Sequence, residues 1–208
     1  WRKSPNVLLP LPFPEERPRR YCLRCGSVSL RHTRRGRAFY FYWVDERCVP
    51  PTDAQSNFGL ADRLLFSKIN LPASHYYRIV GEGAPGEEAI LYSSLVKATV
   101  PTVDDVPIFD FVLLGVGEDG HTSSVFPDRK DLLTAAEPYA VSVNPYNKTV
   151  RICMTGKPMI EAKHTCFLVA GENKCSILKK ILDKEQEDIY PASYIWHHAR
   201  MPKLYASL

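Results

Sequence analysis

The chain has 208 residues, of which 24% are charged and 45% belong to the hydrophobic set. This length and composition allow one sizeable core and exclude a wholly disordered or collagen-like chain. No apolar run approaches the roughly 20 residues of a transmembrane helix, and six cysteines in such a chain do not make a small disulfide scaffold, so we expect reduced thiols and a cytoplasmic location.

The first part of the chain differs in composition from the rest. Residues 1–37 hold ten Lys and Arg against two Glu, a balance of +8, although the whole chain carries only +4. Five prolines lie within residues 1–18 and disfavour regular helices and central strands. We therefore predict a basic, weakly ordered leader over 1–38 and one α/β domain over 39–208.

Two functional interpretations of the leader are weaker. An Arg-rich arm is typical of nucleic-acid binding, but the remainder of the chain is net acidic, which disfavours a nucleic-acid partner. Cys22 and Cys25 have the spacing of half a zinc site, but no second ligand pair follows at a suitable distance. We expect neither nucleic acid nor a bound metal.

The body of the chain alternates strand and helix patterns. Apolar, aromatic and β-branched runs predict strands over 39–44, 108–114, 149–155, 165–170 and 194–196. Apolar residues at helical spacing predict helices over 56–69, 86–98 and 172–184. Repeated strand-then-helix order predicts a mostly parallel sheet with helices on both faces, an α/β class.

Polar clusters follow three of the predicted strands. Asp45, Glu46 and Arg47 follow the first, the segment 115–121 follows the second, and the segment 171–174 follows the strand at 165–170. Ligands of open α/β sheets bind outside the carboxyl ends of the strands, so clusters far apart in the sequence can meet in one site there. This convergence is the main functional prediction from the residues.

The segment 115–121 contains Gly115, Gly117 and Gly120, which formally match a dinucleotide-binding fingerprint. The acidic residue expected about 20 positions later is not convincing, and Asp119 and His121 flank the last glycine. We favour a loop that presents His121 beside Asp119 as a general base for activating water. The alternative is a surface or helix-capping histidine.

Three cations complete the predicted site. Arg47, Arg151 and Lys174 suit an anionic substrate, because arginine forks match phosphate geometry and Lys174 lies at the start of a predicted helix. Asp45 and Glu46 either face the substrate or fix Arg47. A phosphorylated small molecule is the expected partner, with no membrane involved and the oligomeric state left open.

Four segments carry a family resemblance. WVDERCVP at 43–50 with Ser56 and Asn57, LGVGEDGHTSSVFP at 114–127, RICMT at 151–155 and GENK at 171–174 resemble the 6-phosphogluconolactonases of the glucosamine-6-phosphate isomerase/6-phosphogluconolactonase superfamily. The resemblance implies hydrolysis of 6-phosphoglucono-1,5-lactone in the oxidative pentose phosphate pathway, without a metal or organic cofactor. It also implies the Rossmann-like fold of glucosamine-6-phosphate deaminases and ribose-5-phosphate isomerases.

The resemblance also implies a role for each predicted residue. His121 would activate the water with support from Asp119, Arg47, Arg151 and Lys174 would hold the phosphate, and Asp45 and Asn57 would line or brace the site. Backbone amides of the loop with Gly115, Gly117 and Gly120 would stabilise the developing oxyanion. The deaminases carry a catalytic glutamate five positions after the histidine, whereas this chain has Phe126 there, which favours the lactonase.

One departure from the lactonases lies in the leader. These enzymes normally begin with a helix and a strand that lead into a Ser-Gly-Gly-Ser-Thr-Pro-like phosphate loop, and CGSVS at 25–29 is a poor match to it. We expect an atypical or truncated N-terminus. The alternatives are therefore a catalytically impaired family member that lacks this loop, or an amino-sugar-phosphate deaminase or isomerase relative.

Overall fold

The computed structural model of the chain describes residues 28–32, 39–69 and 71–207. Its strands are β1 Val28–His32, β2 Phe39–Trp43, β3 Asp45–Arg47, β4 Tyr76–Tyr77, β5 Thr102–Val103, β6 Val106–Pro107, β7 Phe111–Leu114, β8 Tyr139–Val143, β9 Val150–Met154, β10 Thr165–Ala170 and β11 Pro202–Ser207. Its α-helices are α1 Asn57–Ala61, α2 Pro85–Thr99, α3 Gly156–Glu161, α4 Cys175–Leu182 and α5 Pro191–His198. A π-helical turn, Asp62–Phe66, and four short 3-10 turns, Ala73–His75, Pro127–Leu133, Glu172–Lys174 and Lys184–Gln186, complete the elements.

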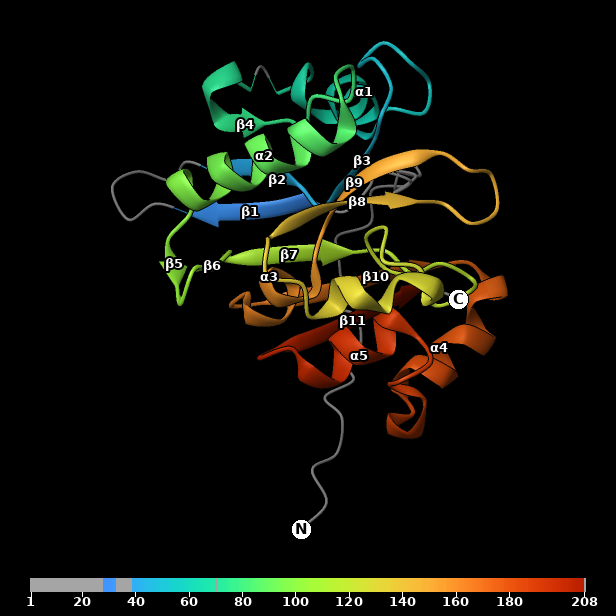
Figure 1. Cartoon of the computed structure of the whole chain (residues 1–208). Coiled ribbons are helices and arrows are strands. Elements are labelled where there is room, and N and C mark those ends of the chain that lie inside the picture. The colour runs from blue at the N-terminus through green and yellow to red at the C-terminus, as the bar shows by residue number, and fades with distance from the viewer. Residues whose placement is uncertain (1–27, 33–38, 70, 208) are drawn as a thin grey trace, which may run out of the picture.

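Two main sheets organise the described residues. The larger has the order β11-β10-β7-β1-β2-β4, and the smaller has the order β3-β9-β8 (Figure 1). The pairs β7–β10, β10–β11 and β2–β4 are parallel, whereas β1 runs antiparallel to both of its neighbours. The smaller sheet is antiparallel throughout. The α/β class is confirmed, and three pairs of the larger sheet are parallel as predicted, whereas the antiparallel pairs of β1 and of the smaller sheet were not predicted.

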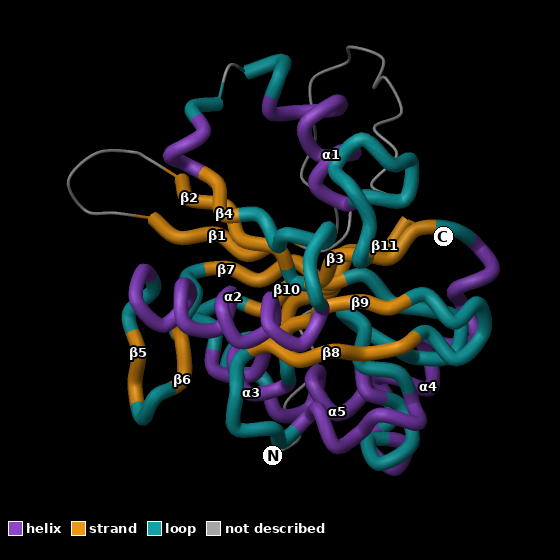
Figure 2. Tube along the Cα trace, turned by 45° about the horizontal axis from the view of Figure 1, so that its top comes forward, coloured by secondary structure: helices purple, strands orange, loops and turns teal. Residues whose placement is uncertain are grey.

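The chain passes from one sheet to the other at Val44, between β2 and β3. The Val44 carbonyl accepts the Met154 N–H at 2.7 Å, so the end of β9 is joined directly to this crossing point. As a result, the carboxyl end of β2 lies beside the smaller sheet, and the polar segment 45–47 becomes a strand rather than a loop. Figure 2 shows β3, β8 and β9 lying together beside the larger sheet.

The core fills the space between the sheets and their helices. Its largest fully buried side chains include Trp43, Tyr42, Tyr92, Phe109, Phe126 and Phe167. In α4, Ile177, Leu178 and Ile181 are buried as the sequence pattern predicts, whereas Leu182, the fourth residue of that apolar pattern, is exposed. The carboxyl ends of β7 and β10 are thereby fixed by packing, which gives the loops that follow them a rigid base.

One predicted element has the wrong type. The segment 194–196, expected to be a strand, belongs to helix α5, which begins with Pro191 at its first turn and buries Ala192 and Ile195 on one side. Proline fits the first helical turn because no intrahelical N–H is needed there. Strands β8 and β11 were not predicted. In the predicted leader, β1 joins the larger sheet, and the rest of that prediction lies outside the described residues.

Candidate active site

The segment after β7 folds into a tight loop that places Asp119 against His121. The Asp119 Oδ1 atom lies 2.5 Å from His121 Nδ1 and also accepts the His121 N–H at 3.2 Å. A carboxylate only accepts hydrogen bonds, so Nδ1 is the donor in this pair, and the tautomer with its proton on Nδ1 has a lone pair on Nε2. Partial burial opposes ionisation of Asp119, but the bonds to His121 and to the Tyr146 hydroxyl hold its pKa well below its ordinary value of 3.8.

Two glycines make this loop possible. A side chain at Gly117 would meet His121 Nδ1 at 2.1 Å, and Gly120 has a φ of +79° while lying against the Tyr190 ring. The Gly117 N–H donates to the His121 carbonyl and the Gly120 N–H donates to the Gly117 carbonyl. The Gly115 carbonyl accepts the Thr122 hydroxyl at 2.9 Å. Because the N–H groups of Gly117 and Gly120 donate to carbonyl groups of the loop itself, these two glycines stabilise the conformation of the loop.

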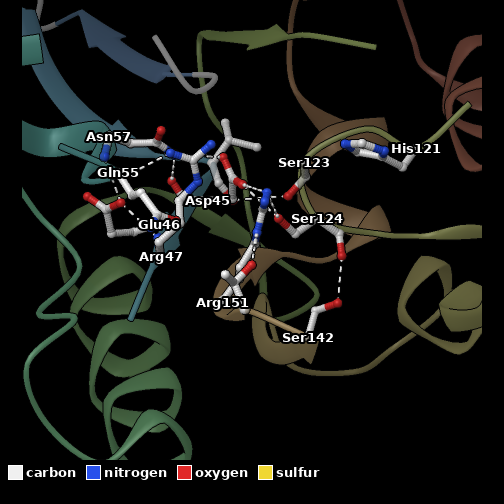
Figure 3. Close-up of polar contacts among 12 residues, drawn as sticks. Asp45, Glu46, Arg47, Gln55, Asn57, His121, Ser123, Ser124, Ser142 and Arg151 are labelled. Atoms are coloured by element: carbon white, nitrogen blue, oxygen red, sulfur yellow. Dashed lines mark hydrogen bonds and ion pairs between the residues drawn. The ribbon is translucent and has the colours of Figure 1, made fainter. Parts of the chain in front are cut away.

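A second polar group surrounds the buried carboxylate of Asp45. Its Oδ2 accepts the Ser124 hydroxyl at 2.7 Å and forms an ion pair with Arg151 at 3.5 Å, and its Oδ1 accepts Asn57 Nδ2 at 3.1 Å (Figure 3). Asp45 is only 5% exposed, so the partners compensate for the desolvation of its charge. Asp45 and Asn57 thus contact each other, and Asp45 also contacts Ser124 and Arg151, an arrangement that suits a bracing role.

Arg47 and Arg151 lie opposite each other in the β3–β9 pair. Directly opposed residues of an antiparallel pair share one face of the sheet, so both arginine side chains lie on the same face. Burial lowers the pKa of Arg151, Asp45 acts to raise it, and the charge of Arg47 lowers it further. The Arg47 Nη1 group donates to the Gln55 carbonyl, while its buried Nε has no partner among the described residues. Two neighbouring cations with spare donor capacity suit a phosphate group.

The ring of Phe126 connects the two groups. The Arg151 guanidinium lies 5.8 Å from the ring centroid, and the His121 ring centroid lies 4.6 Å from it. In the view of Figure 3, Arg151 lies between Arg47 and His121. The predicted base and the predicted arginines therefore belong to one region. Arg151 lies nearer than Arg47 to the segment 115–121, which carries His121 and is called the histidine loop.

Lys174 reaches the same loop from the end of β10. Its Nζ lies 3.9 Å from a Glu118 carboxylate oxygen, and the neighbouring Asn173 side chain also donates to that carboxylate. Lys174 is thereby tied to the residue directly before Asp119. The structure thus brings all three predicted polar clusters to neighbouring positions, although it shows no direct contact between Lys174 and the arginines in the described chain.

Glu46 supports the site from behind. Its carboxylate accepts the backbone N–H groups of Arg47, Asn57 and Phe58, each at 2.8 Å, and the Ser56 hydroxyl at 3.1 Å. Burial raises the pKa of Glu46, whereas these N–H groups lower it. Of the alternatives for this residue, the structure favours fixing the backbone of Arg47 and the start of α1.

Sequence reasoning did not single out Ser124, Glu118 and Tyr146, each of which contacts a predicted residue, or Asn173, which contacts Glu118. Ser124 and Glu118 lie inside the quoted motif, so their proximity could have been inferred, but Tyr146 lies in a turn 25 residues beyond His121 and carries no pattern of its own. Within the described ranges, no group of three His, Cys, Asp or Glu side chains is arranged to hold a metal ion. None of the described helices is long and apolar enough to cross a membrane.

Comparisons with known proteins agree on one family. Residues 29–204 match the model of the glucosamine-6-phosphate isomerases/6-phosphogluconolactonase family. The chain is similar to the 6-phosphogluconolactonase of Haemophilus influenzae, with 38% identity covering 75% of this chain and 66% of that protein. The chain thus spans about two thirds of the length of this relative.

Solved structures give the same result. The crystal structure described as devB protein is 40% identical, with a TM-score of 0.75 over 80% of this chain and 70% of that one. The crystal structure of 6-phosphogluconolactonase from Leishmania guyanensis is 27% identical, with a TM-score of 0.67 over 79% of this chain and 70% of that one. The family match over residues 29–204 includes the three polar clusters at 45–47, 115–121 and 171–174.

Proposed function

Because the chain belongs to the glucosamine-6-phosphate isomerase and 6-phosphogluconolactonase family, we propose that it hydrolyses 6-phosphoglucono-1,5-lactone to 6-phosphogluconate. The observation that carries this proposal is the pair of His121 Nδ1 and Asp119 Oδ1, which lie 2.5 Å apart. The Phe126 ring lies next to the His121 ring and also contacts Arg151. The pair supplies a general base, and the arginines supply a site for the phosphate at the far end of the substrate. A cytoplasmic location belongs to the same proposal and is supported by the four described cysteines, which are free thiols.

The proposed reaction needs one proton carrier. Nε2 of His121 accepts a proton from water as the water oxygen attacks the lactone carbonyl, and Asp119 stabilises the imidazolium through Nδ1. The tetrahedral intermediate then breaks the bond between the carbonyl carbon and the ring oxygen. Nε2 returns its proton to that oxygen, which becomes the hydroxyl of the open-chain acid, so the imidazole is neutral again after one turnover.

The phosphate gives the reaction its geometry. Arg47 and Arg151 bind the 6-phosphate by charge-assisted hydrogen bonds. Lys174 instead forms an ion pair with Glu118 of the histidine loop. Holding the remote phosphate orients the carbonyl towards the base and lowers the entropic cost of reaching the transition state. Phosphate binding by the arginines and proton transfer by His121 are thus assigned to separate groups. This fits the described part of the structure, in which the two arginines lie beside the loop that carries His121 and do not contact its ring.

Phe126 favours the lactonase over the deaminase reaction. Its ring is fully buried and lies 4.6 Å from the His121 ring, at the position where the resemblance to deaminases would require a glutamate. A phenyl group transfers no proton, so His121, supported by Asp119, is the proton carrier at this place. Ester hydrolysis needs only one such carrier in the mechanism above.

The proposal is tested with two substrates and one reference compound. We expect 6-phosphogluconolactone to be consumed faster than it hydrolyses in buffer, and glucosamine 6-phosphate to release no ammonia. Glucono-1,5-lactone without the phosphate should show a kcat/KM lower by about 100-fold, the value of two charge-assisted hydrogen bonds. Ammonia release without lactone hydrolysis would assign the chain to the other branch of the family.

A further inference from the structure

The second oxygen of Asp119 has a partner outside the histidine loop. Asp119 Oδ1 binds His121, whereas Oδ2 accepts the phenolic O–H of Tyr146 at 2.8 Å. The Asp119 side chain is only 17% exposed, so few water molecules compete for these positions. The hydrogen bond to this carboxylate raises the pKa of Tyr146, which keeps the phenol protonated and able to donate.

Tyr146 is held in place by the loop between β8 and β9. The Asn144 side-chain oxygen accepts the N–H groups of Tyr146 and Asn147 at 2.8 and 3.2 Å, which is an Asx turn. The loop closes through two backbone bonds, from the Asn144 N–H to the Thr149 carbonyl and from the Lys148 N–H to the Asn144 carbonyl. A tyrosine that is 69% exposed is therefore directed to Asp119 by its backbone rather than by packing.

The same hairpin carries Arg151 two residues beyond the loop. Its Nε lies 3.5 Å from Thr149 Oγ1, so the guanidinium and the Tyr146 hydroxyl rest on one short segment. From this arrangement we propose that Tyr146 is a positioning residue, which fixes the carboxylate plane of Asp119 and through it the ring of His121. Its kinetic consequence rests on the function proposed above, but its effect on the His121 ring does not.

The test compares Tyr146→Phe with the matched variant Tyr205→Phe. Tyr205 lies on β11 and is also exposed, at 48%, so the control removes a phenolic hydroxyl elsewhere on the surface. In Tyr146→Phe we expect kcat to fall about fivefold, the value of one hydrogen bond, with KM changed by less than about twofold. In the Asp119→Asn background the same substitution should have no further effect on kcat.

The second readout requires no substrate. The Nδ1 proton of His121, observed by nitrogen-edited NMR in the resting protein, should exchange with water faster in Tyr146→Phe and remain as in the wild type in Tyr205→Phe. An unchanged exchange rate overturns the proposal whether or not the protein hydrolyses the lactone. A protein that shows faster exchange but no lactone hydrolysis would instead contradict only the proposed function.

Discussion

At the residue scale, Arg151 combines two tasks that arginine performs better than lysine. Its guanidinium forms an ion pair with buried Asp45, contacts the Ser124 hydroxyl at 3.3 Å and lies over the Phe126 ring, 5.8 Å from the centroid. A planar fork can keep these contacts and still offer donors to a phosphate. The charge alone would not fix that geometry.

The substitution Arg151→Lys should therefore weaken substrate binding more than catalysis. We expect KM for 6-phosphogluconolactone to rise about tenfold, the value of one charge-assisted hydrogen bond, and kcat to fall less than about threefold. Steady-state kinetics measure both parameters. Arg200→Lys is the matched control, because Arg200 pairs with Glu161 on the surface. A KM within twofold of the control would remove Arg151 from the phosphate site.

At the element scale, the start of α1 depends on a residue from another strand. Ser56 caps the helix by accepting the Gly59 N–H, and the Glu46 carboxylate accepts two further N–H groups of its first turn. Helix α1 has only five residues, too few to be stable by itself. The contact with β3 therefore determines where the helix begins and where Asn57 points.

We expect Glu46→Gln to lower the free energy of unfolding by about 2–4 kcal/mol, because an amide N–H₂ would replace one oxygen opposite backbone donors. Denaturant unfolding measures this difference. Glu82→Gln is the matched control, since Glu82 pairs with Arg78 at an exposed position and should cost under about 1 kcal/mol. Equal values for the two variants would contradict the supporting role of Glu46.

The elements differ in how much the sequence revealed of them. Strands at β2, β7, β9 and β10 and helix α4 follow from long apolar or amphipathic runs. For 86–98 the helix is confirmed, but Leu91, one of the apolar residues at helical spacing that predict it, is 64% exposed, and Tyr92 and Val96 are buried instead. Tyr92 is a hydrogen-bonding core residue, which a count of aliphatic positions does not identify. Helix α5 and strands β8 and β11 depend on tertiary packing rather than on their own pattern.

The candidate site was predictable in part for a physical reason. Parallel strands bring their carboxyl ends to one edge, so the clusters at 45–47, 115–121 and 171–174 could be placed together from the strand pattern alone. Contacts such as Tyr146 with Asp119 depend on the length and turn geometry of the β8–β9 loop. Periodicity carries no information about such contacts.

At the scale of the whole molecule, three buried aromatic residues join the two sheets and α2. The Tyr92 hydroxyl accepts the Trp43 N–H at 3.0 Å and donates to the Tyr77 carbonyl at 2.7 Å. The Tyr139 hydroxyl donates to the Trp43 carbonyl at 2.9 Å, and the Tyr92 and Tyr139 rings meet edge to face. Both backbone groups of Trp43 are thereby satisfied at the point where β2 approaches the smaller sheet.

This network makes stability sensitive to alkaline pH. Burial raises the pKa of Tyr92 and of Tyr139 well above the ordinary value of 10.0. Above that value the unfolded chain loses phenolic protons that the folded chain retains, so the free energy of unfolding decreases as pH rises. We expect a steeper decrease between about pH 9.5 and 11 in the wild type than in Tyr92→Phe.

Denaturant unfolding across this pH range measures the slopes. Tyr205→Phe is the control, because it removes an exposed phenol outside this network and should leave the slope unchanged. A wild-type slope equal to that of Tyr92→Phe would show that the buried Tyr92 phenol does not hold its proton in the folded state.

The central claim is that the imidazole of His121 activates water for an ester whose phosphate the nearby cations hold. It is tested most directly by the rate of 6-phosphogluconolactone hydrolysis for the wild type, for His121→Ala and for buffer alone. We predict that the wild type exceeds the spontaneous rate and that kcat falls about 10²- to 10⁴-fold in the variant, the range for losing a general base. A His121→Ala protein that hydrolyses the lactone as fast as the wild type would contradict the account.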